Sequence, residues 1–210
     1  GTFTCSTGTV AVTGAVTFSA GTLNGSTGPF TVTGNWTRTG GTFTPGAGTV
    51  TFTGGALQAL NSGGAGGAFN NISHTGAATL QVTTNALTVG GTLTNSAGTF
   101  GANALAVTVT GLTTLSGGTY LASTATQTLT GGLTSSGGTL TGSTGAVAVG
   151  GALTLSSGVL TAPTGTFTVS GSWSRSGGTF TPGAGTVTFD GAGTQTLDSG
   201  LAWKKFKAIC

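Results

Sequence analysis

Acidic, histidine and cysteine side chains are scarce in this chain, which has only Asp190, Asp198, His74, Cys5 and Cys210. Two carboxyl groups can act as general acid and base when they lie roughly 5 to 9.5 Å apart, and Asp190 and Asp198 could approach each other across a turn. The matching positions in an earlier copy of the same motif hold Thr53 and Asn61. Because the repeat does not need the carboxylates, we predict a protein that is not an enzyme, with no catalytic residue and no cofactor.

His74 has no acid or nucleophile at a spacing that would place one beside it. Serine and threonine are so frequent that a Ser-His-Asp pattern carries no information. We therefore expect His74 on the surface or in a turn. Zinc sites gather about four Cys, His or carboxylate ligands around one point, and two distant cysteines cannot meet one histidine in this way, so we predict no metal site.

A long internal repeat organises the chain. The segment GTFTPGAGTVTF occurs at Gly41 to Phe52 and again, unchanged, at Gly178 to Phe189. At the same offset, residues 1–73 match residues 138–210 without a gap, and 44 of the 73 positions are identical. We predict a single repeat domain over residues 1–210.

A shorter period of ~20 residues lies inside the long one. The residue after each Gly-Thr or its equivalent forms a column of apolar side chains: Phe3, Leu23, Phe43, Leu80, Phe100, Tyr120, Leu140, Leu160 and Phe180. The spacing is constant except between Phe43 and Leu80, where the chain holds the Gly-rich sequence NSGGAGG. We interpret that sequence as a loop or bulge before a strand that returns to the core, and we expect seven short units in each long repeat.

Each unit alternates apolar residues with Thr, Ser or Ala and is interrupted by Gly-containing pairs. This pattern is typical of half-buried strands separated by turns, and so short a unit must stack on its neighbours to bury its apolar side. The sequence thus predicts an all-β, parallel β-solenoid (β-helix), right-handed, with about ten coils of ~20 residues.

Composition excludes several classes of function. Only 3% of the residues are charged, and the net charge of +3 is too small for a nucleic-acid-binding surface. The chain has no apolar run long enough to cross a bilayer, so we expect no membrane insertion. Because the first residue is Gly and no signal peptide is evident, we expect a processed product or an excerpt of a longer chain.

Neither end of the sequence shows the polar or helical cap that solenoids use to cover their last strands. Two explanations fit: the chain is cut from a longer array, or the last coil of one molecule stacks on the first coil of the next and gives a head-to-tail homopolymer. We expect the homopolymer and keep the excerpt as the alternative. Candidate end-stacking residues are Phe3, Val10, Val12, Trp203, Phe206 and Ile209.

The two cysteines lie in the first and the last coil. At ~4.8 Å per layer they are separated by about 50 Å, whereas a disulfide needs Cα atoms within roughly 7 Å. A bond from Cys5 to Cys210 is thus possible only between successive molecules. The alternative is two free thiols, one of which fills a small space in the core.

Two Trp-x-Arg motifs occupy equivalent positions, Trp36 with Arg38 and Trp173 with Arg175. They could form a surface patch that stacks on sugar rings or on a neighbouring filament. In the alternative interpretation the Trp side chains fill the core and the Arg side chains extend to water.

Outward-facing threonines form rows such as Thr2 with Thr4 and Thr42 with Thr44, an arrangement that ice-binding solenoids use. Along the Gly-Thr column the rows are interrupted, for example at Gly101 and Leu121. Threonine is also a good strand former that builds hydroxyl ladders. We keep ice binding as a minor alternative.

The unit GTFTPGAGTVTF, followed by Gln195-Thr-Leu and a Phe-x-x-Ile frame, resembles the tandem repeats of large bacterial cell-surface and secreted proteins. These are adhesin-like, haemagglutinin-like and autotransporter-passenger β-solenoids. The resemblance implies an extracellular or cell-surface location and a structural or adhesive role. We expect a structural filament or matrix fibre, with a repeat segment of a long adhesin that binds a glycan or a surface as the alternative.

Overall fold

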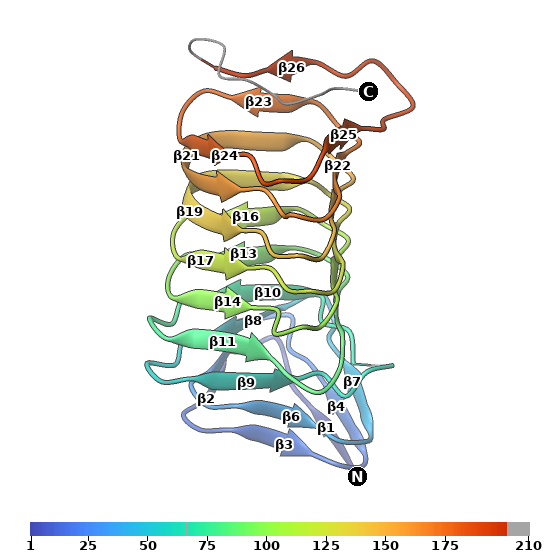
Figure 1. Cartoon of the computed structure of the whole chain (residues 1–210). Helices are drawn as coiled ribbons and strands as arrows, with labels where there is room; N and C mark the ends of the chain where they lie inside the picture. The colour runs from blue at the N-terminus through green and yellow to red at the C-terminus, as the bar shows by residue number, and fades with distance from the viewer. Residues whose placement is uncertain (66, 201–210) are drawn as a thin grey trace.

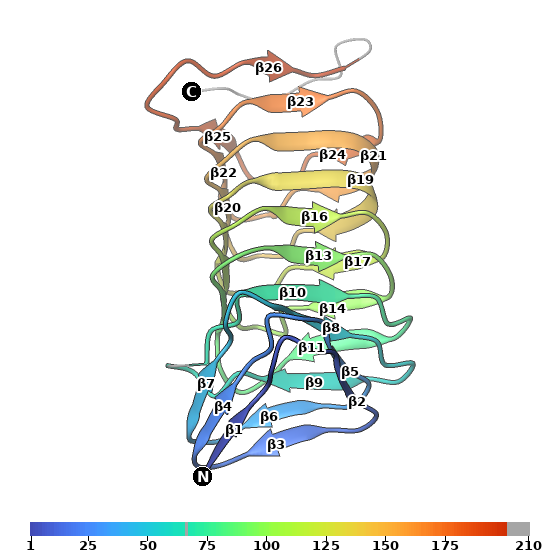
Figure 2. The same ribbon diagram turned by 180° about the vertical axis from the view of Figure 1, so that it is seen from behind.

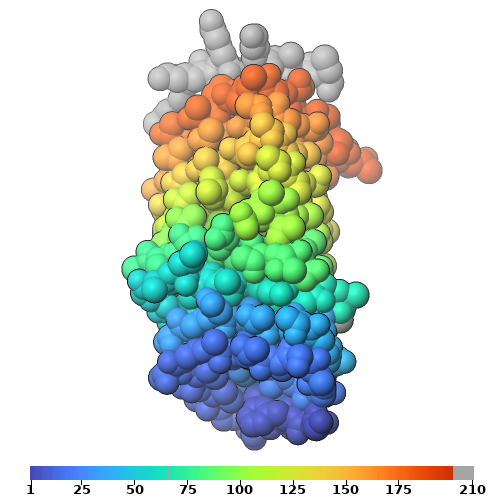
Figure 3. All heavy atoms as spheres, turned by 60° about the horizontal axis from the view of Figure 1, so that its bottom comes forward, coloured from blue at the N-terminus to red at the C-terminus, as the bar shows by residue number. Residues whose placement is uncertain are grey.

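The computed structural model describes residues 1–65 and 67–200, which contain 26 strands and no helix. The strands are parallel and stack as a β-solenoid of about ten coils of ~20 residues (Figure 1), as the sequence predicts. Seen from one side, the near strands run to the right and the far strands to the left while the chain climbs from the N-terminus (Figures 1 and 2). This is a right-handed coil. The space-filling view shows a slim rod (Figure 3).

Each coil has three sides, and strands of the same side form one ladder. The first side is made of two sheets, with the buried Phe69 between them: β1 (Thr2–Thr4), β4 (Thr22–Asn24) and β7 (Thr42–Thr44), then β12 (Leu87–Val89), β15 (Val107–Val109), β18 (Gln127–Leu129), β20 (Val147–Val149), β22 (Phe167–Val169) and β25 (Val187–Phe189).

The second side is one continuous parallel ladder. It contains β2 (Val10–Val12), β5 (Phe30–Val32), β8 (Thr49–Phe52), β10 (Asn71–His74), β13 (Leu93–Asn95), β16 (Thr113–Leu115), the first part of β19 (Leu133–Thr141), the first part of β21 (Leu153–Thr161), β23 (Trp173–Arg175) and β26 (Leu197–Asp198).

The third side is also continuous. It contains β3 (Val16–Phe18), β6 (Trp36–Arg38), β9 (Gln58–Asn61), β11 (Thr79–Val82), β14 (Thr99–Gly101), β17 (Thr119–Leu121), the last part of β19, the last part of β21 and β24 (Thr179–Thr181). The long strands β19 and β21 pass around the corner and therefore join the second and third sides into one sheet.

Alternation of period two decides which side chains enter the core. In a strand such as β5, Phe30 and Val32 are buried while Thr31 between them is partly exposed, because successive side chains of a strand point to opposite faces. Parallel pairing in register then places like above like: Leu87 pairs with Val107, and Val89 pairs with Val109. The three inward faces meet in a single core along the rod.

Glycine is needed at the corner between the second and third sides. Gly118 and Gly158 have φ of +60° and +83°, a conformation that side chains with a Cβ rarely adopt. A Cβ at Gly118 would also lie 2.5 Å from the carbonyl oxygen of Gly98 in the coil below. The coils can therefore turn sharply and still stack closely.

The described residues of the Gly-rich sequence that follow β9, 62–65 and 67, lie outside any strand, and Phe69 and Ile72 then return to the core. This prediction is confirmed. The prediction that Leu80 continues the column of Phe43 is wrong, because Leu80 pairs with Gln58 of β9 on the third side, whereas Phe43 lies in β7 on the first side. Phe69 takes the place above Phe43 on the first side, with ring centroids 5.2 Å apart, and bridges to Val89 of β12.

The second copy of the long repeat is rotated by one third of a turn relative to the first. The segment Val10–Val12 (β2) lies on the second side, whereas its counterpart Val147–Val149 (β20) lies on the first side. Likewise β6 belongs to the third side and its counterpart β23 to the second. The offset between the two copies is thus not a whole number of coils, so the expectation of seven complete units is wrong.

Candidate functional site

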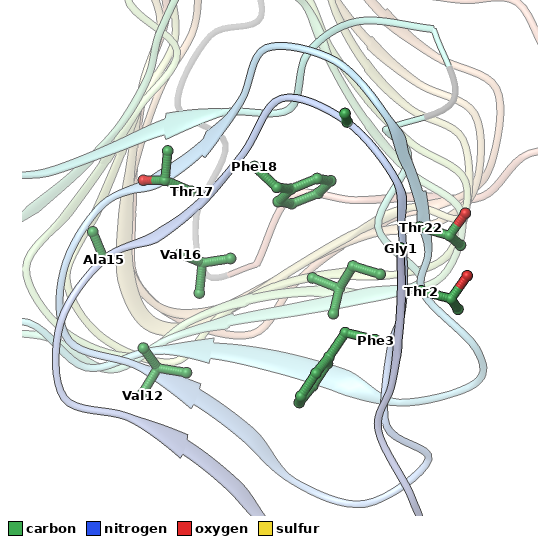
Figure 4. Close-up of a pocket in the computed structure, with 11 residues that line it drawn as sticks. Gly1, Thr2, Phe3, Val12, Ala15, Val16, Thr17, Phe18 and Thr22 are labelled. Atoms are coloured by element: carbon green, nitrogen blue, oxygen red, sulfur yellow. The ribbon is translucent and has the colours of Figure 1, made fainter.

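The first coil presents an apolar layer at the N-terminal end of the rod. Phe3 is 62% exposed, and Val10 and Val12 are only half-buried. A hollow of about 530 Å³ lies at this end, lined by Phe3, Val12, Val16, Phe18, Leu23 and neighbouring residues. Figure 4 shows several of these side chains pointing into the same space. The sequence-predicted residues Phe3, Val10 and Val12 thus lie in one open layer.

The second copy shows the matching positions when a preceding coil covers them. Leu140, Val147 and Val149 are the counterparts of Phe3, Val10 and Val12, and each is at most 1% exposed. They lie against the strands β17 and β18 of the preceding coil. Apolar side chains at these positions can therefore be buried by a coil that pairs in parallel with the layer.

The other predicted assembly residues, Trp203, Phe206, Ile209 and Cys210, lie outside the described residues. Cys5 is a free, buried thiol just after β1. Burial raises the pKa of this thiol, which lowers the fraction of thiolate, the form that reacts. The intermolecular Cys5–Cys210 bond stays a prediction.

Trp36 and Trp173 are core residues, at 0% and 1% exposure. Trp36 contacts the rings of Phe43 at 4.8 Å and Phe69 at 5.0 Å, and Trp173 contacts Phe180 at 5.0 Å. Their predicted role as a sugar-stacking surface is wrong, because neither ring face is accessible, and the two motifs lie on different sides of the rod. The alternative, that both rings fill the core, is confirmed.

Arg38 is also buried, at 4% exposure, and does not extend to water. Its guanidinium donates to the carbonyl oxygens of Ser62 at 2.7 Å and Ala65 at 2.6 Å, and to those of Gly41, Gly63 and Gly64. The Gly-rich loop thus wraps around one cation. The half-buried Arg175 donates to the carbonyl oxygens of Gly177 and Gly178, so neither Arg forms the predicted surface patch.

His74 is completely buried, and its predicted position on the surface or in a turn is wrong. Asn95 donates from Nδ2 to the Thr119 carbonyl at 3.0 Å, which leaves its Oδ1 as the acceptor for His74 Nδ1 at 2.7 Å. His74 Nε2 has no partner among the described residues. Desolvation lowers the pKa of His74, against a smaller opposing effect of the Asn95 hydrogen bond.

The two aspartates make separate local contacts. Asp190 accepts a hydrogen bond from Ser170 Oγ at 2.7 Å, and Asp198 accepts one from the backbone N–H of Gly200 at 2.9 Å. Within residues 1–65 and 67–200, no three His, Cys, Asp or Glu side chains are grouped so that they could hold a metal ion.

The second side carries an uninterrupted column of outward hydroxyl groups that the sequence reasoning missed. Pairing in register connects Thr31, Thr51, Ser73, Thr94, Thr114, Thr134, Thr154 and Ser174. The signal is present in the sequence as tripeptides such as Thr94-Asn-Ser96. The column is hard to recognise in the sequence, because the strands before and after the junction near residue 61 have different sequence motifs.

Comparisons with protein-family models, with curated proteins and with solved structures found no match. The described part of the chain contains no helix that is long and apolar enough to cross a membrane.

Proposed function

We propose that this protein is a structural, extracellular β-solenoid that assembles by stacking the last coil of one molecule on the first coil of the next. The observation that carries the proposal is the open N-terminal layer. Its apolar side chains stand uncovered at the end of the ladders, whereas the matching apolar side chains of the second copy are buried under a coil.

Two kinds of interaction support this mode of assembly. A coil placed on the first layer continues three parallel ladders, so that backbone N–H and C=O groups gain partners. It also removes Phe3 and the surrounding hollow from water, and burial of a Phe side chain contributes about 1.5–3 kcal/mol. Few charges oppose the approach, since only 3% of the residues are charged.

The second candidate is a segment of a long bacterial adhesin of the kind that the repeats resemble. There, a preceding coil of the same chain would cover the first layer. The long internal repeat favours this candidate, because tandem units related by one third of a turn continue the same three ladders.

Electron microscopy of the purified chain, with and without a reductant, tests the proposal. We expect regular unbranched filaments with an axial repeat of about 50 Å, from roughly ten layers of ~4.8 Å. Shortening of the filaments under reductant would support a Cys5–Cys210 bond. Discrete rods whose length is the same with and without reductant would contradict the filament proposal and favour the proposal of an adhesin segment.

A matched pair of variants locates the contact. Phe3→Lys places a charge in the stacking layer, and we expect it to abolish filaments because a buried, unpaired charge is costly. Leu57→Lys is the control, since Leu57 is also 62% exposed but lies in the turn between β8 and β9, away from the end. If the two variants assemble equally well, the first layer is not the interface.

A further inference from the structure

The second side carries two parallel columns of hydroxyl groups, here called the hydroxyl array. The central column runs from Thr31 to Ser174, as given above. A second column lies two residues further along the chain, at the corner: Thr33, Thr53, Thr75, Ser96, Ser116, Ser136, Ser156 and Ser176. Ser136 and Ser156 lie within β19 and β21, and the others follow directly after the end of a strand. Backbone hydrogen bonds fix its register, for example Thr75 N–H to the Phe52 carbonyl at 3.0 Å and Ser96 N–H to the His74 carbonyl at 2.9 Å. Figure 2 shows the strands of this side one above another.

The central column has a regular spacing. Neighbouring coils are ~4.8 Å apart, so its hydroxyl groups repeat at about this distance. Parallel pairing repeats this spacing over eight successive coils without a change of residue class. The ladders hold the central column in register, so it is a preorganised row of hydroxyl groups. The corner column follows it less regularly, because Ser136 pairs with Ser157 after a shift of register.

The central hydroxyl groups have no hydrogen-bond partner among the described residues, although each can donate one hydrogen bond and accept two. Some corner hydroxyls, such as Ser96 and Ser156, donate to a backbone carbonyl of the coil below and keep their oxygen lone pairs. The array thus presents hydrogen-bond donors and acceptors to a ligand on the outer surface of the second side.

The chemistry of the array selects its ligand. It contains no charged side chain, which disfavours a mineral or an anionic surface. The aromatic rings of this side, Phe30, Phe52 and Trp173, all point into the core, which disfavours sugar stacking because no ring face is exposed. A neutral, repeating partner that forms only hydrogen bonds remains, and the crystalline form of water fits this description.

We propose that the hydroxyl array binds ice. Ordered water molecules occupy the repeating positions between the hydroxyl groups, and the threonine methyl groups favour an ordered first layer of water. The rigidity of the ladders means that little conformational entropy is lost on binding. The site is independent of the end layer, so it operates in a single rod or in a filament.

Two measurements on the whole chain test this site. One is the fraction of protein incorporated into a slowly growing ice front, and the other is inhibition of ice recrystallisation in a frozen sucrose solution. We expect enrichment in ice and inhibition of recrystallisation. The pair Thr94→Tyr and Thr114→Tyr disrupts the centre of the array, and we expect it to weaken both effects by about tenfold or more.

The matched control is the pair Thr108→Tyr and Thr128→Tyr. These residues occupy the same outward strand position on the first side, and we expect this pair to keep the wild-type effects. Circular dichroism and thermal melting check the fold of each variant. If the first pair does not fold, Thr134→Lys with Thr154→Lys provides the same test.

Absence of both effects in the wild-type chain would overturn the proposal, and so would equal losses in the two pairs of variants. Enrichment on crystalline cellulose or chitin without enrichment in ice would also overturn it and would identify a polysaccharide lattice as the ligand.

Discussion

His74 is a neutral imidazole inside the core, and its surroundings make protonation costly. Its column neighbours are Phe52 in the coil below and Asn95 in the coil above. Since Asn95 Oδ1 accepts the Nδ1 proton, the buried Nε2 has no described partner either as an acceptor or, once protonated, as a donor. An unsatisfied buried polar group costs about 1–3 kcal/mol, so acid should destabilise this part of the rod.

The free energy of unfolding should therefore fall on acidification from pH 8 to pH 5. The pKa of His74 lies below its ordinary value of 6.5 in the folded chain. Below pH 6.5 the unfolded chain binds a proton that the folded chain excludes, and the loss of stability continues until the folded pKa is reached. Denaturant titrations at several pH values measure this slope.

His74→Leu provides the control for the pH dependence. Leu115 already occupies the same column two coils further along, so leucine fits the position. His74 is the only histidine of the chain, and ordinary carboxyl groups titrate near pH 4. The free energy of unfolding of this variant should not change between pH 8 and pH 5. If it falls with pH as steeply as in the wild-type chain, another group causes the dependence.

At the scale of the strand and its corner, glycine decides how closely two coils approach. Gly118 combines a positive φ with a carbonyl oxygen 2.5 Å from where a Cβ would lie. Gly101, in contrast, lies within strand β14 without a positive φ, and a Cβ there would be 3.8 Å from its nearest neighbour, a methyl group of Thr79. The same residue type is thus required at one position and replaceable at the other.

Gly118→Ala should destabilise the rod by about 1–2 kcal/mol from the left-handed conformation alone, and by more from the backbone clash. Gly101→Ala should be neutral or slightly stabilising, because alanine loses less backbone entropy on folding. Thermal and urea unfolding compare the two variants. Equal destabilisation would show that the corner geometry is not what requires glycine.

Most of the stacking could be predicted from the sequence, because the short sequence period is the period of one coil. The columns Phe3, Leu23, Phe43 and Leu80 to Phe180 are each correct within their own segment. The error lies at residues 61–78, where the loop around Arg38 adds residues and the next strand falls on a different side. A pattern of residue types cannot show how many sides such a loop crosses, since that depends on its backbone path.

This error also hid the hydroxyl array. Thr51 belongs to a Thr-Val-Thr-Phe strand and Thr114 to a Thr-Thr-Leu strand, so the two look like members of different columns in the sequence. Only the pairing of β8 with β10, and of β10 with β13, shows that they share one side. Burial of His74 was missed for a related reason, because its column is defined only after the junction is placed.

At the scale of the whole rod, the junction near residue 61 is the layer at which one of the three ladders is interrupted. The second and third sides cross it as continuous ladders, but the first side changes from a three-stranded to a six-stranded sheet, with Phe69 as the described bridge. Phe69 is 1% exposed and contacts the rings of Trp36, Phe43 and Phe52 at 5.0, 5.2 and 6.3 Å. Toward β12, Phe69 makes backbone hydrogen bonds to Thr88 and Gly90. Toward β7, packing of its ring on Phe43 joins the two sheets.

Phe69→Ala should therefore uncouple the first three coils from the rest. The substitution removes about 3–5 kcal/mol of packing at this layer, and in a solenoid each coil is stabilised mainly by its nearest neighbours. Hydrogen exchange followed by mass spectrometry should show that β1 to β7 lose protection well before β14 to β22. Phe100→Ala is the control, because Phe100 is equally buried against Tyr120 but lies where all three ladders are continuous. That variant should lower protection on both sides of its own layer, and the same pattern in Phe69→Ala would mean that the two continuous ladders are sufficient to couple the rod.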